Sequence, residues 1–180
     1  ADPDINIYLN RSALPRPIFV NQAIVVNSHQ AAWEQLKSPG FDPMSYVILE
    51  NAEDDVQPFS LREAPPLDYD LAILQYDLHT VEIGLQTNTP GYLFLSDAYY
   101  PGWQAFVDGQ PAPLYRANYA FRAVPVLAGE HTLRFEFKPL SWRIGLAISG
   151  LTLLGLGIFA AVQLLNNKRR RTKDEGRNKA

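Results

Sequence analysis

Seven polar and aromatic residues between positions 97 and 119 have the side-chain types that carbohydrate sites use. Aromatic faces stack on sugar rings, while carboxylate, guanidinium and amide groups hydrogen-bond to sugar hydroxyls. The candidates for contact with a glycan or another acceptor are Asp97, Tyr99, Tyr100, Trp103, Arg116, Asn118 and Tyr119. Alternatively, the rings build the core of a small β domain, where large side chains bury the most area. Asp97, Arg116 and Asn118 are the better functional candidates, because a core does not require polar groups.

The rest of the sequence shows no pattern of a catalytic or metal site. His29, His79 and His131 have no partner at the spacing of a zinc site or a catalytic triad, which favours polar surface positions. The acidic run 53–55 has the oxygen ligands for a divalent cation, but adjacent carboxylates in a loop are more often solvated. We therefore predict no catalytic residue, no metal site and no cofactor in this chain.

Residues 69–139 must position the candidate side chains, and their pattern is that of an antiparallel β-sandwich. Apolar and polar residues alternate with a period of two; in the last strand Leu133, Phe135 and Phe137 alternate with charged residues. Turn signals separate these runs, the clearest being the hairpin dipeptide Asp108-Gly109. No helical pattern interrupts them, so we predict a mainly β fold.

A smaller strand-helix-strand element is predicted before the sandwich, within residues 1–50. The stretches "PIFVNQAIVV" and "SYVILE" are rich in β formers, and "SHQAAWEQLKSPG" between them has a helix cap at Ser28 or Asn27 and a Pro-Gly stop. Such an element is too small to be stable alone, so we expect it to pack on another part of the chain. The acidic, proline-rich residues 51–68 are predicted to form a linker or crossing loop.

Residues 144–165 are 22 residues without a charge and predict a transmembrane helix. At about 1.5 Å per residue the helix spans roughly 33 Å, against about 30 Å for a hydrocarbon core. Trp142 and Arg143 precede the run, and the basic stretch "NNKRRRTK" follows it. By the positive-inside rule, we expect the tail 166–180 in the cytoplasm and residues 1–139 outside it. The tail could also attract anionic lipid or nucleic acid, but we predict no nucleic-acid partner because a topology signal is the simpler explanation.

The beginning of the sequence predicts that this chain is the C-terminal piece of a longer membrane protein. It opens "ADPDINIYLN", without the apolar region of a secretion signal, so earlier spans are expected to carry the domain across the membrane. The absence of cysteine agrees with a bacterial envelope protein without establishing one.

The stretch "SDAYYPGWQAFVDGQPAPLYRANYAFRAVPVLAGEHTLRFEFKP", followed by one span, resembles the C-terminal end of bacterial YfhO-type membrane proteins. "NRSALPRPIFV" and "FDPMSYVILE" also resemble that family, so the similarity covers about residues 8–160. The family resembles C-type glycosyltransferases, which implies a multi-span enzyme that moves a sugar from a polyprenyl-phosphate carrier to an envelope polymer such as lipoteichoic acid. The catalytic carboxylate of such enzymes lies in an early outer loop that this chain lacks. The resemblance therefore assigns no catalytic residue here, and the fragment by itself is expected to be inactive.

Two functions follow as expectations. The first is an extracytoplasmic accessory domain, with the last membrane span, of a glycosyltransferase-like protein of the bacterial cell membrane. Its partners would be the membrane, the upstream transmembrane domain of the same protein, and an envelope glycan or lipid-linked sugar. The alternative is a membrane-anchored β domain without enzymatic activity that binds glycans or acts as a scaffold.

Overall fold

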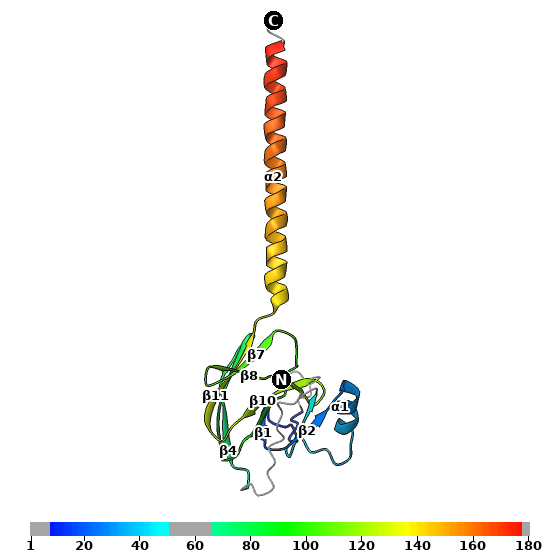
Figure 1. Ribbon diagram of the computed structural model, residues 1–180, viewed down its shortest axis with the longest axis vertical. Coiled ribbons are helices and arrows are strands. Elements are labelled where there is room, and N and C mark those ends of the chain that lie inside the picture. Colours follow the sequence, from blue (N-terminus) through cyan, green and yellow to red (C-terminus); the bar gives the residue numbers. More distant parts are fainter. Residues whose placement is uncertain (1–7, 51–65, 178–180) are drawn as a thin grey trace, which may run out of the picture. The chain divides into compact units, whose positions relative to one another are not determined.

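The computed structural model describes residues 8–50 and 66–177, with side chains described up to residue 163. The chain forms two compact units, residues 1–138 and residues 139–180. The described residues of the first unit form two β-sheets and one short helix (Figure 1). The acidic run 53–55 and most of the predicted linker 51–68 lie outside the described residues.

One sheet has six strands and includes the predicted strand-helix-strand element. Its spatial order is β1 (Pro17–Val20), β6 (Gly91–Leu95), β10 (Phe121–Val126), β9 (Tyr115–Ala117), β3 (Val47–Glu50) and β2 (Ala23–Val26). β2 and β3 are parallel and are connected through α1 (His29–Leu36), whose N-cap is Ser28, one of the two residues predicted for it. β3 pairs with β9, so this element continues the sheet of the later strands instead of forming a layer of its own.

The apolar stretch at 17–26 forms two strands, where the sequence had suggested one. β1 pairs with β6 at one edge of the six-stranded sheet, whereas β2 pairs with β3 at the other. Only Asn21 and Gln22 separate them, so the chain turns away from the first edge immediately after Val20. Continuous β propensity did not indicate the break, because each half satisfies its backbone groups with a different partner.

The other sheet has five strands, all antiparallel. Its order is β4 (Tyr69–Tyr76), β5 (Thr80–Thr87), β11 (Gly129–Phe137), β7 (Trp103–Val107) and β8 (Gln110–Ala112). The predicted Asp108-Gly109 hairpin joins β7 and β8. Both turn residues are left-handed, with φ values of 51° and 77°, as a two-residue type I′ turn requires.

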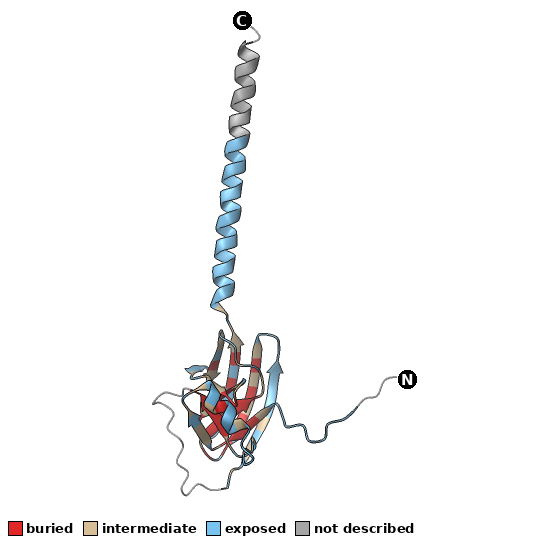
Figure 2. Cartoon of the chain, turned by 90° about the vertical axis from the view of Figure 1, so that its right-hand side faces the viewer, coloured by how far each residue is buried: buried red, intermediate tan, exposed pale blue. Residues whose placement is uncertain are grey.

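The two sheets pack face to face around one buried cluster, which confirms the predicted β-sandwich. Its side chains are Phe19, Leu93, Leu95, Val124 and Val126 from the six-stranded sheet and Val81, Ile83, Leu85, Ala105, Leu133 and Phe135 from the five-stranded sheet. Leu133 and Phe135 point inward, as the alternation in the last strand predicted. Figure 2 shows the buried residues gathered within this unit.

The six-stranded sheet is buried on both faces. In β6, Leu93 and Leu95 belong to the cluster between the sheets, whereas Tyr92 and Phe94 belong to a second cluster on the opposite face. This explains why β6 reads "GYLFL", an apolar run without alternation. The first residue of β6, Gly91, has to be a glycine, because a Cβ there would lie 2.5 Å from the carbonyl oxygen of Val20.

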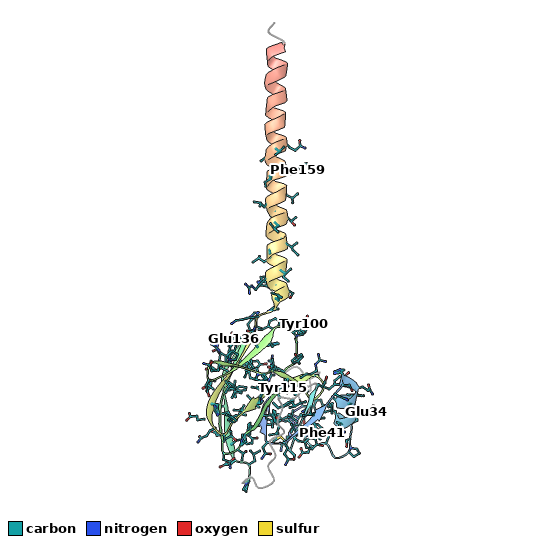
Figure 3. The ribbon with its side chains drawn as sticks, viewed as in Figure 1. Glu34, Phe41, Tyr100, Tyr115, Glu136 and Phe159 are labelled. Carbon is teal, nitrogen blue, oxygen red and sulfur yellow. The ribbon has the colours of Figure 1, made fainter. Side chains whose placement is uncertain are left out.

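The second unit contains α2 (Leu140–Arg177). Its segment Leu140–Gln163 has a mean hydropathy of 2.1 and is long and apolar enough to cross a membrane. Every side chain in this segment is exposed, including that of Phe159 (Figures 2 and 3). An apolar helix that buries no face within its own chain is typical of a membrane span, in agreement with the prediction from residues 144–165.

Candidate functional site

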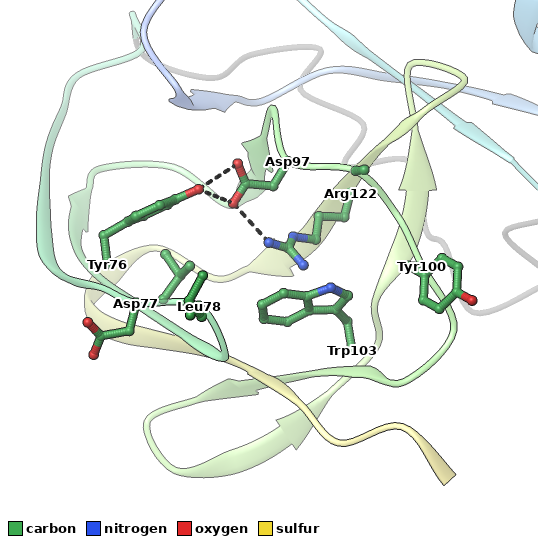
Figure 4. A pocket seen from close by; sticks show the side chains of 9 residues that line it. Tyr76, Asp77, Leu78, Asp97, Tyr100, Trp103 and Arg122 are labelled. Atoms are coloured by element: carbon green, nitrogen blue, oxygen red, sulfur yellow. Dashed lines mark hydrogen bonds and ion pairs between the residues drawn. The ribbon is translucent and has the colours of Figure 1, made fainter. Parts of the chain in front are cut away.

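Asp97, in the loop after β6, is the centre of a polar network between distant segments. Its Oδ1 accepts hydrogen bonds from Arg16 Nη1 at 3.0 Å and from the Tyr76 hydroxyl at 3.1 Å. Its Oδ2 accepts from Arg122 Nη2 at 2.9 Å. We call these four residues the Asp97 network; Figure 4 shows its contacts around Tyr76 and Arg122. The network joins β4 and β10, one from each sheet, to the segment before β1.

Arg122 is the most deeply buried member, with only 1% of its surface exposed. Its guanidinium lies 3.8 Å from the ring centroid of Trp103 and 5.4 Å from that of Phe135. Burial lowers the pKa of Arg122, and the Asp97 carboxylate acts in the opposite direction. Nε and Nη1 have no hydrogen-bond partner among the described residues, so Asp97 is the group that balances this charge.

An open pocket of about 580 Å³ lies beside the network. It is lined by Tyr76, Asp77, Leu78, Val81, Asp97, Ala98, Tyr100, Trp103 and Arg122. Three of these side chains are aromatic, and Tyr100 is 63% exposed. Burial, together with the hydrogen bond to Asp97, raises the pKa of Tyr76, which therefore stays protonated at neutral pH. The volume lies in the range of small-molecule sites, although this pocket is open to solvent.

A second polar centre surrounds Glu50, the last residue of β3. Its side chain is 4% exposed, and His29 Nδ1 lies 2.9 Å from Oε2. Arg116 Nη1 on β9 lies 3.9 Å from the same oxygen. We call these three residues, with Tyr99 and Tyr119, the Glu50 cluster.

Aromatic rings lie against His29 and Arg116 of the Glu50 cluster. Tyr119 stacks on the His29 ring with 3.8 Å between centroids, and the Arg116 guanidinium lies 5.0 Å from the Tyr99 ring centroid. Tyr119 has φ 72°, a strained left-handed conformation in the β9–β10 turn that places its ring on His29. A hollow of about 450 Å³ is lined here by Glu50, Tyr99, Leu114, Tyr115 and Arg116.

Asn118 belongs to neither group, because it completes backbone pairing. It is 5% exposed and has φ 44°. Its backbone N–H donates to the carbonyl of Ile48 at 2.8 Å, and its Oδ1 accepts from the N–H of Ile48 at 2.8 Å. The side chain thus takes the place of a strand neighbour for β3, which is a structural role.

The structure therefore divides the seven candidate residues. Asp97, Tyr100 and Trp103 line the pocket, and Tyr99, Arg116 and Tyr119 lie in the Glu50 cluster. Sequence reasoning missed four important partners, namely Arg16, Tyr76, Glu50 and Arg122. Arg122 carried a usable signal, because it occupies the same face as Val124 and Val126 in an apolar strand.

His29 and His79 are exposed and His131 is partly exposed, as predicted for polar surface positions, but two of the three have acidic partners. His29 contacts Glu50, and His131 Nδ1 lies 2.7 Å from Asp108 Oδ2. Their partners are 21 and 23 residues away and belong to other elements, so sequence spacing did not reveal them. Within the described part of the chain, no group of three or more His, Asp or Glu side chains could hold a metal ion.

Comparison with protein families gives one match. Residues 67–149 match the model of the family described as bacterial membrane protein YfhO. The matched segment runs from just before β4, through β11, to the tenth residue of α2. Comparisons with curated proteins and with solved structures gave no match.

Proposed function

Residues 67–149 belong to the YfhO family of bacterial membrane proteins, and from this premise we propose that the β unit is an extracytoplasmic accessory domain of a glycosyltransferase-like protein. The upstream transmembrane domain of that protein would carry out sugar transfer to a cell-envelope polymer. The β unit would contact the acceptor glycan or the lipid-linked sugar.

The pocket beside the Asp97 network is the observation that carries this proposal. Tyr100 presents an exposed aromatic ring, and Trp103 provides a second ring in the same pocket. The exposed carboxylate of Asp77 supplies a hydrogen-bonding group in this pocket, whereas the hydroxyl of Tyr76 is already paired with Asp97 and Arg16. Stacked rings together with hydrogen-bonding groups are the chemistry that recognises a sugar.

The proposed role of the pocket is recognition. Three side chains already donate to the Asp97 carboxylate, two of them guanidinium groups. A carboxylate held in this way is poorly placed to remove a proton from a substrate hydroxyl. The reaction would therefore depend on residues outside this chain.

A second candidate function is a membrane-anchored domain without enzymatic activity, either glycan-binding or a scaffold. The contact between Arg122 and Trp103 favours the scaffold, because one face of the best sugar-stacking ring is covered by the guanidinium 3.8 Å from its centroid. A scaffold needs the Asp97 network for stability and does not need the pocket to be open.

The accessory role is tested in cells that contain the complete protein. Deletion of residues 1–138, with α2 retained, should lower the incorporation of sugar into the envelope polymer, measured with radiolabelled sugar donor. Equal protein levels in the membrane fraction are the control. Normal incorporation after the deletion would reject the accessory role and leave the second candidate.

The pocket itself is tested by replacing its exposed ring. Tyr100→Ala should weaken binding of envelope glycan fragments to the full chain by about fivefold to tenfold, as loss of one aromatic contact predicts. Calorimetric titration in detergent measures this change. Tyr8→Ala is the matched control, because Tyr8 is 88% exposed and does not line the pocket. Equal affinity of both variants would remove the pocket from the proposal.

A further inference from the structure

The turn between β4 and β5 presents an apolar side chain without a structural role. Leu78 lies at its tip and is 89% exposed, between the polar residues Asp77 and His79. Short turns usually contain glycine, proline or small polar residues, since a large apolar group there gains nothing from folding. Tyr100 is 63% exposed and lines the same pocket, so two large exposed side chains lie at one edge of it.

This edge lies at the end of the β unit from which the chain continues into α2. The N–H of Phe137 donates to the carbonyl of His79 at 2.9 Å, and the N–H of Lys138 donates to that of Gly102 at 2.7 Å. Both loops are therefore held against the last residues of the unit. Figure 3 shows Tyr100 and Glu136 at this same end of the β unit.

The covalent distance to the apolar helix is short. Lys138 lies two residues before Leu140, where the membrane-capable segment begins, and two residues reach at most about 7 Å. Trp142 and Arg143 follow directly, and these are the residue types that anchor helix ends at a membrane surface. If α2 crosses a bilayer, its first turn lies at the lipid headgroups, and Lys138 must lie close to the same level.

We propose that Leu78, Tyr100 and Lys138 form a lipid-contact rim, which rests in the headgroup region of the membrane that α2 enters. Leucine and tyrosine insert apolar surface at this depth, and the side chain of Lys138, which is 61% exposed and paired with Glu136, extends into the polar headgroups. This inference depends on α2 crossing the membrane and is independent of glycan binding.

Site-directed spin labelling tests the rim in the full chain. The natural sequence has no cysteine, so Leu78→Cys and Leu127→Cys each give one labelled position. Leu127 is the matched control, since it is also an exposed leucine, at 67%, and lies in the turn between β10 and β11 at the opposite end of β11. The chain is reconstituted into vesicles of phosphatidylcholine and phosphatidylglycerol, and power saturation compares relaxation by oxygen and by a water-soluble nickel chelate.

The expected result is a reversal between the two positions. The label at 78 should relax more with oxygen, which partitions into lipid, and the label at 127 more with nickel, which stays in water. Far-ultraviolet circular dichroism of both labelled variants checks that the fold is kept.

Each other outcome overturns the proposal. Stronger relaxation by the nickel chelate at both positions means that the rim does not contact the bilayer. Shielding of position 78 from both reagents means that protein, such as a second copy of the chain, covers it. Preference for oxygen at both positions means that lipid contact is not confined to this end. Because no glycan is present, failure here leaves the proposed function untouched, and loss of glycan binding leaves the rim untouched.

Discussion

The Asp97 network and the Glu50 cluster are built alike but differ in burial. Each places one largely buried carboxylate, 14% exposed for Asp97 and 4% for Glu50, beside aromatic rings and two nitrogen-bearing side chains, two arginines in the first and a histidine and an arginine in the second. In the first, the side chain of Arg122 is 1% exposed. In the second, the side chains of His29 and Arg116 are 45% and 38% exposed.

This difference indicates what each centre contributes. The charge of Arg122 has lost its hydration, so the fold depends on the carboxylate that faces it. His29 and Arg116 remain in contact with water, where ion pairs stabilise little and salt weakens them. The Asp97 network is therefore the structural wall of the pocket, whereas His29 and Arg116 remain partly accessible to other molecules.

Removal of Asp97 should have the largest effect. Asp97→Ala leaves the Arg122 charge buried without a counterion and should lower the free energy of unfolding by about 3–5 kcal/mol. Urea unfolding of the full chain in detergent, followed by tryptophan fluorescence, measures it. The control is Asp77→Ala, an exposed carboxylate of the same pocket, with an expected change within about 0.5 kcal/mol. Equal losses in the two variants would contradict the distinction.

Asn118 gives the next effect, beside the Glu50 cluster. Asn118→Ala leaves the buried N–H of Ile48 without its acceptor and should cost about 1–3 kcal/mol in the same unfolding measurement. The structural role assigned to Asn118 is wrong if the alanine variant is as stable as the natural chain.

Tyr76→Phe should cost about 1 kcal/mol at neutral pH, because Asp97 keeps its two guanidinium partners. The effect also depends on pH in a defined direction. The folded pKa of Tyr76 is raised above 10.0, so its contribution is complete below pH 10 and is lost as pH rises through the folded value. Unfolding measured at increasing alkaline pH should show a shallower decline for Tyr76→Phe than for the natural chain. Identical slopes would contradict the coupling to Asp97.

His29→Ala should have the smallest effect, below about 1 kcal/mol, since His29 itself is half exposed and Arg116 remains beside Glu50. High salt should reduce this loss further, whereas the loss from Asp97→Ala should persist because that pair is shielded from solvent. Unfolding measured at low and high salt compares the two centres directly. A loss for His29→Ala as large as that for Asp97→Ala would remove the difference between them.

The sequence by itself determined the elements whose physics is local. Period-two alternation places Leu133 and Phe135 inside because neighbouring side chains of a strand point to opposite faces. The Asp108-Gly109 turn, the Ser28 cap and the apolar segment of α2 follow from backbone conformation, hydrogen bonding and hydropathy within a few residues. The resemblance to the YfhO type was also readable, and the family match confirms it over residues 67–149.

Only the tertiary structure decided which polar residues meet. Arg16 and Asp97 are 81 residues apart, and Tyr76 and Asp97 are 21 apart. Their contact depends on which strands pair and in what register, since β1 and β10 flank β6 while β4 lies in the other sheet. A local sequence pattern does not indicate which strands pair or in what register. The sequence could therefore supply the candidates of residues 97–119, but their division between a pocket, a cluster and a backbone turn followed from the packing of the two sheets.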